Sequence, residues 1–86
     1  MPLTLLSESE ITDILKRNPR SDFFIRFGDG TDELIWTKNE KLEANISSDG
    51  YPLIARGNVI QAYNAAIRYY NRNLTHLSGM LTVIAI

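Results

Sequence analysis

The segment Met80-Leu-Thr-Val-Ile-Ala-Ile86 constrains the fold most, because six of its seven residues are apolar. A run of this length without polar alternation is typical of a strand that is buried on both faces, in the interior of a sheet. The chain is therefore expected to build a sheet around residues 80–86.

A first helix is predicted over residues 8–17. Ser7 and Glu10 match the Ser-x-x-Glu capping box, and Asn18-Pro19 ends the helix because proline disfavours helical backbone at the residue before it.

A second, longer helix is predicted to begin after Arg56-Gly57-Asn58, with Asn58 as its N-cap, and to end near residues 71–73. Its core-facing stripe, recurring at helical spacing, comprises Val59, Tyr63, Ala66, Ile67 and Tyr70.

Further strands are indicated by alternation of polar and apolar residues. Residues 22–28 place Phe23, Ile25 and Phe27 on one face, and residues 33–37 complete a hairpin with them. A third strand is predicted over residues 41–46. Residues 51–55 are expected to form a short edge strand, since Pro52 cannot donate to a central ladder.

The predicted element order is α-β-β-β-(β)-α-β. It favours an α+β fold in which four or five mostly antiparallel strands carry both helices on one face. The length of 86 residues fits a single domain spanning residues 1–86.

Composition excludes several classes of protein. The chain has no cysteine, so it has no disulfides or thiolate sites, and no apolar run is long enough for a membrane span. It also lacks the cationic start of a secretory signal. We expect a soluble, cytoplasmic protein without membrane contact.

Charge is unevenly distributed along the chain, although the net value is only −1. Residues 1–49 hold all ten acidic residues and six basic ones, a net of −4. Residues 50–86 hold three arginines and no acid, a net of +3. This asymmetry bears on association with partners rather than on fold.

The second helix provides the first candidate binding surface. Its side away from the predicted core carries polar and basic residues, with a tyrosine beside them: Asn64, Arg68, Tyr69, Asn71 and Arg72. Arginine and tyrosine are enriched at binding hot spots and also suit nucleic acid. A merely solvated helix face is the alternative interpretation.

The predicted hairpin region provides a second, acidic candidate, comprising Asp29, Asp32, Glu33, Glu40 and Glu43. Such a surface suits a basic groove on a partner. The alternative is that these charges only protect a strand edge from unwanted pairing.

Motifs for catalysis or cofactor binding are incomplete. Gly28-Asp29-Gly30 lacks the third glycine and the following helix of a phosphate-binding loop, and a calcium loop would need more carboxylates. His76, the only histidine, has no serine in a nucleophile elbow. We therefore expect no catalytic residues, no metal site and no cofactor.

Three classes of function remain. The first and favoured one is a small non-enzymatic regulator or inhibitor that covers the surface of another protein. The second is a nucleic-acid-binding module that uses the arginine and tyrosine face, for which three arginines are few. The third is a homodimeric structural or assembly subunit.

Overall fold

The computed structural model describes residues 3–28, 33–35, 44–46, 52–73 and 79–86. Its elements in chain order are β1 (Leu3–Thr4), α1 (Glu8–Arg17), β2 (Phe23–Gly28), β3 (Glu33–Ile35), β4 (Ala44–Ile46), β5 (Pro52–Ile54), the 3-10 turn η1 (Arg56–Asn58), α2 (Val59–Asn73) and β6 (Gly79–Ala85). The two predicted helices are both present, and the bounds of the first match the prediction.

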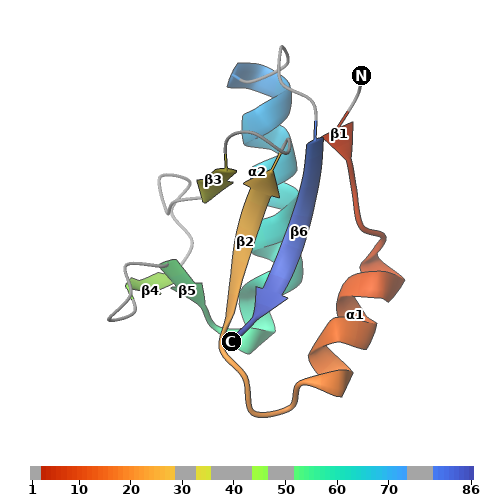
Figure 1. Ribbon diagram of the computed structural model, residues 1–86, viewed down its shortest axis with the longest axis vertical. Helices are drawn as coiled ribbons and strands as arrows, with labels where there is room; N and C mark the ends of the chain where they lie inside the picture. The colour runs from red at the N-terminus through yellow and green to blue at the C-terminus, as the bar shows by residue number, and fades with distance from the viewer. Residues whose placement is uncertain (1–2, 29–32, 36–43, 47–51, 74–78) are drawn as a thin grey trace.

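The strands form one sheet in the order β1-β6-β2-β5-β4, and β3 also pairs with β2. All pairs are antiparallel except β1 with β6, so the predicted α+β class is confirmed. Figure 1 shows α2 running along one face of β2 and β6, whereas α1 lies on the β6 side of the sheet.

Strand β6 lies between β1 and β2, as predicted for an interior strand. The prediction that both of its faces are buried is wrong. Leu81 and Val83 are buried on the face that meets the helices, but Thr82 and Ile84 are only half-buried and Met80 is 43% exposed. The run therefore contains more apolar residues than the fold buries.

Strand β5 lies between β2 and β4, so the prediction of a short edge strand over residues 51–55 is wrong. It pairs with β4 along its length and with β2 only at Ile54, opposite Phe23. Pro52 faces β4 alone, beyond the end of the pairing with β2. The missing proline amide is tolerated because the ladder with β2 does not extend to it.

Strand β1 was not predicted, since two residues carry no detectable alternation. It runs parallel to β6, with Leu3 opposite Gly79 and Thr4 opposite Met80. If the register continued, the Leu6 amide would donate to the carbonyl of Leu81.

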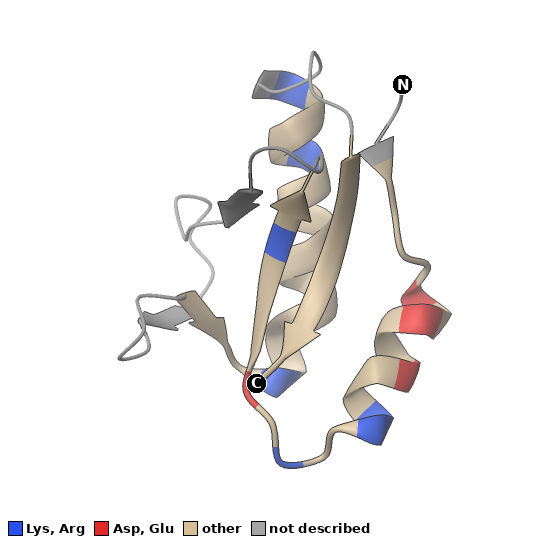
Figure 2. Ribbon diagram, in the orientation of Figure 1, with Lys and Arg blue, Asp and Glu red and all other residues tan. Residues whose placement is uncertain are grey.

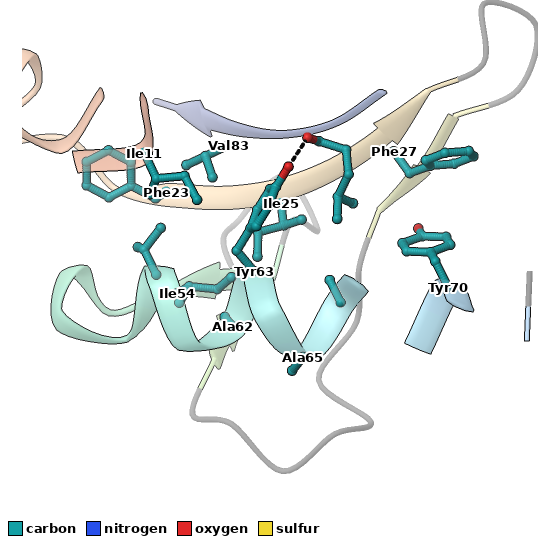
Figure 3. Close-up of a cluster of buried hydrophobic side chains, with 13 residues drawn as sticks. Ile11, Phe23, Ile25, Phe27, Ile54, Ala62, Tyr63, Ala65, Tyr70 and Val83 are labelled. Carbon is teal, nitrogen blue, oxygen red and sulfur yellow. Dashed lines mark hydrogen bonds between the residues drawn. The ribbon is translucent and has the colours of Figure 1, made fainter. Parts of the chain in front are cut away.

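The hydroxyl of Tyr63 from α2 occupies that position instead. It accepts from the Leu6 amide at 2.7 Å and donates to the Leu81 carbonyl. Figure 3 shows the phenol crossing from α2 to β6 with the second of these bonds dashed. One side chain therefore ends the β1–β6 ladder and connects it to α2.

One core lies between the sheet and the helices (Figure 3). Its buried members come from both helices and from three strands: Ile11, Phe23, Ile25, Phe27, Ile54, Val59, Ala62, Tyr63, Ala65, Ala66, Tyr70, Leu81 and Val83. The predicted inward face of β2 is confirmed. Phe24, on the opposite face, is also buried but outside this cluster.

The N-terminus of α1 has the predicted capping box. The Ser7 hydroxyl accepts from the Glu10 amide at 3.1 Å, and the Glu10 carboxylate accepts from the Ser7 amide at 3.1 Å. Because these amides are satisfied locally, α1 can begin soon after the chain leaves the β1–β6 pair.

The C-terminus of α1 is held by Arg56. Its guanidinium donates to the carbonyls of Leu15 and Asn18, the latter at 3.1 Å, and lies 5.6 Å from the centroid of the Phe23 ring. The two carbonyls also accept backbone amides, Leu15 from Asn18 and Asn18 from Ser21, so the guanidinium adds a second donor to each. Its charge complements the helix dipole.

The start of the second helix differs from the prediction. Residues 56–58 form the 3-10 turn η1, whose N-cap is Ala55 without a side-chain hydrogen bond, so Asn58 is not the N-cap. The Asn58 amide donates to the Ala55 carbonyl at 2.8 Å. The turn places Arg56 in contact with α1. This tertiary contact cannot be predicted from local capping preferences.

Within the described ranges, neither helix combines the length and apolarity that a membrane crossing requires.

Tyr63→Phe is expected to lower the free energy of unfolding by about 1–3 kcal/mol, because it leaves the Leu6 amide and the Leu81 carbonyl without their shared partner. Chemical denaturation measures this loss. Tyr70→Phe is the matched control, since it removes a hydroxyl from the same helix and leaves the bridge intact. Equal losses in the two variants would contradict the assigned role.

Arg56→Met is expected to lower the free energy of unfolding by about 0.5–1 kcal/mol and to speed amide exchange in the last turn of α1. Arg56→Lys should recover only part of the loss, because an ammonium lacks the planar fork that spans two carbonyls. The control is Arg68→Met, at an exposed arginine. If Arg68→Met matched Arg56→Met in both measurements, the role of Arg56 in holding the C-terminus of α1 would be refuted.

Candidate functional site

The exposed side of α2 is the candidate binding surface, and we call it the outer face. Its exposed residues are Gln61, Asn64, Arg68, Asn71 and Arg72. They recur at spacings of three, four, three and one, which places them on one side of a helix. Helix α2 contains no acidic residue, so the outer face carries only amide and guanidinium groups.

The inner side of α2 fixes the direction of the outer face. Tyr63 is bonded to two backbone groups, and the Tyr70 ring lies 4.8 Å from that of Phe27, centroid to centroid, at 33°. Because both anchors point to the sheet, rotation of α2 about its axis would break them. The outer face is therefore held away from the sheet.

Four of the five residues predicted for this surface share the outer face, and Gln61 joins them. Tyr69 does not, because it is half-buried on the flank of the helix. Its ring meets the Tyr70 ring edge-on, with centroids 5.9 Å apart and an interplanar angle of 84°. A helical wheel separates Tyr69 from Arg68 by 100°, so counting residues along the helix could have found this.

The two arginines lie in the last turns of α2, as Figure 2 shows by their blue colour. The Arg72 Nε donates to the Arg68 carbonyl at 3.3 Å. This bond supports the end of the helix and directs the Arg72 side chain back along the outer face. Positive charge is thus concentrated at one end of the helix.

Arg56, the third arginine of the acid-free region, does not belong to this surface. Its guanidinium is bound to the end of α1. The charge of +3 in residues 50–86 therefore divides into one structural cation and two on the outer face.

The acidic candidate surface falls largely outside the described residues. Asp29, Asp32, Glu40 and Glu43 are not described, and of Glu33 the structure gives the backbone, paired with Gly28 in β3. His76 also lies outside. These predictions therefore stay predictions.

No group of three or more histidine, aspartate or glutamate side chains that could hold a metal ion is found in the part of the chain that the structure describes. The comparison with family models, curated proteins and solved structures found no match to this chain. Function is therefore inferred from the geometry of the site.

Two tyrosines of α2, Tyr63 and Tyr70, have raised pKa values. Burial raises the pKa of Tyr70 to about 12, and the neighbouring Tyr69 contributes to the rise. Burial also raises the pKa of Tyr63; the hydrogen bond from the Leu6 amide opposes this effect and the Glu10 carboxylate adds to it. Both phenols thus stay protonated in the fold at pH values where a free tyrosine ionises.

The raised pKa of Tyr70 predicts that the free energy of unfolding falls between about pH 10 and 12. In that window the unfolded chain loses the Tyr70 phenol proton that the folded chain retains, which costs up to about 1.4 kcal/mol per pH unit. The raised pKa of Tyr63 acts in the same direction. Denaturation across this range measures the decline, and Tyr70→Phe should make it shallower. A wild-type value that does not change up to about pH 11.5 would contradict the burial of these phenols.

Proposed function

We propose that this domain is a small non-enzymatic regulator or inhibitor that binds another protein and acts by covering part of its surface. The outer face of α2 is the binding surface in this proposal. The observation that carries it is the exposed, acid-free row of amide and guanidinium side chains on a helix whose opposite side is locked to the sheet.

The chemistry of the outer face supports an acidic partner. Arg68 and Arg72 place two guanidinium groups on this face, and their own helix contains no carboxylate. Arginine is favoured at interfaces because its planar guanidinium makes paired hydrogen bonds to carboxylates. Asn64 and Asn71, on the same face, add donors and acceptors that fix orientation.

A fixed helix also reduces the cost of association. Side chains on a helix that is anchored by Tyr63 and Tyr70 lose less freedom on binding than those on a loop. Occlusion of a partner surface needs such a presented face and no catalytic group. The same face gives less support to nucleic-acid binding, because Tyr69 contacts Tyr70 instead of standing with the arginines for stacking on bases.

The charge-reversal variant Arg68→Glu/Arg72→Glu tests this proposal. Recovery of the bound protein in affinity purification from native cells is expected to fall at least about tenfold, which corresponds to about 1.4 kcal/mol. Quantitative mass spectrometry measures the recovery, and circular dichroism verifies that the variant is folded.

A matched control is available in α1. Lys16→Glu/Arg17→Glu makes the same change in charge at a helix end, and the Arg17 Nε donates to the Asp13 carbonyl at 3.3 Å, as Arg72 does to Arg68. This control should keep the partner. Equal losses in both variants, or enrichment of DNA or RNA instead of protein, or recovery only of further copies of this chain, would each refute the proposal.

A further inference from the structure

The N-terminal part of the chain contributes little to the core. We call residues 3–18, which comprise β1, α1 and Asn18, the arm, and residues 22–86 the body. Among the described residues, the core cluster contains thirteen buried side chains, and Ile11 alone belongs to the arm. Because the body supplies the other twelve, the arm can separate from it while the body stays folded.

The seat of the arm is made of groups that the body holds in place by itself. Strand β6 pairs with β1 through its backbone, and the Tyr63 hydroxyl accepts from the Leu6 amide at 2.7 Å. Arg56 donates to two carbonyls at the end of α1. An occupant of this seat must match the spacing between these three positions, and the arm of a second copy matches it by construction.

The arm and the body are connected by a tight turn (Figure 1). The Ser21 amide donates to the Asn18 carbonyl at 3.3 Å across Pro19 and Arg20. When this turn opens, residues 19–21 can extend as a hinge that spans about 13 Å between Asn18 and Asp22. The arm can then reach a second body that lies beside the hinge.

An exposed apolar residue lies next to the hinge. The Ile86 amide donates to the Asp22 carbonyl at 2.9 Å, and the Ile86 side chain is 54% exposed. Two extended hinges would hold two bodies within about 13 Å at this end, which brings their Ile86 side chains within reach of each other. This contact would exist only in the pair and would remove apolar surface from water.

We propose that a second copy of this chain is a partner of the domain and that the two copies exchange their arms. Each arm occupies on the other body the seat that it has in the single copy. Since the arm keeps its contacts, the balance depends on the hinge, on Ile86 and on the freedom lost in association. The inference goes beyond the proposed function and does not rest on it. The exchanged dimer presents the outer face twice, because α2 stays in its own body.

Paired cysteines distinguish exchanged arms from any other dimer, since the sequence contains no cysteine. Thr4→Cys/Met80→Cys places one thiol in the arm and one in the body, at opposite positions of the β1–β6 pair. The matched control is Arg26→Cys/Thr82→Cys, an opposite pair within the body. Each protein is refolded at about 1 mM, fractionated by size exclusion, oxidised and analysed on a denaturing gel without reductant.

The wild type is expected to form a dimer of twice the chain mass of 9.8 kDa, whose share grows with concentration. In the dimer fraction, Thr4→Cys/Met80→Cys should give covalently joined chains, whereas the control gives single chains. Ile86→Ser should lower the dimerisation constant at least about fivefold. Met80→Ser should leave it unchanged, because Met80, although 43% exposed, lies at the other end of β6.

Three outcomes overturn the inference. These are a wild type that is monomeric at about 1 mM, a dimer in which Thr4→Cys/Met80→Cys gives only single chains, and equal effects of Ile86→Ser and Met80→Ser. Failure of the proposed function is detected separately, because Arg68→Glu/Arg72→Glu changes neither the arm, nor the hinge, nor the groups of the seat.

Discussion

The hydroxyl of Tyr63 links three parts of the chain that are far apart in sequence. It occupies the place of the next hydrogen bond in the β1–β6 ladder, between the amide of Leu6 and the carbonyl of Leu81. The first strand must leave the sheet at this point, and α1 begins two residues after Leu6. Because the phenol belongs to α2, the same bonds also set the position of that helix on the sheet.

The candidate function depends on this anchoring. One side of α2 is held against the core by the hydrogen bonds of Tyr63 and by the ring contact between Tyr70 and Phe27. The remaining side consists of amides and guanidiniums, with Ile60 and Ile67 at its margin. A helix fixed in this manner presents its polar row in one orientation, which favours recognition of a partner with complementary shape and charge. Two of the three positive charges of residues 50–86 thereby lie on one exposed face.

Much of the local structure could be predicted from sequence. The capping box set the start of α1, and periodicity gave the inward face of β2 and most of the outer face of α2. Contacts between distant segments could not be predicted. Residue propensities do not reveal that a tyrosine hydroxyl replaces a hydrogen bond of the β1–β6 ladder. Nor do they reveal that the Arg56 side chain extends from η1 to the C-terminus of α1. Tyr69 was misplaced because proximity in sequence was taken for proximity on the helix surface.

Amide hydrogen exchange at Leu6 tests the central claim most directly. Leu6 lies between β1 and α1, in neither a strand nor a helix, so regular secondary structure gives its amide no protection. If the Tyr63 hydroxyl accepts from this amide, its exchange should be slowed to a rate near that of the core strands, and Tyr63→Phe should abolish the protection. A Leu6 amide that exchanges in the wild type as fast as the exposed amide of Ser9 would contradict the account.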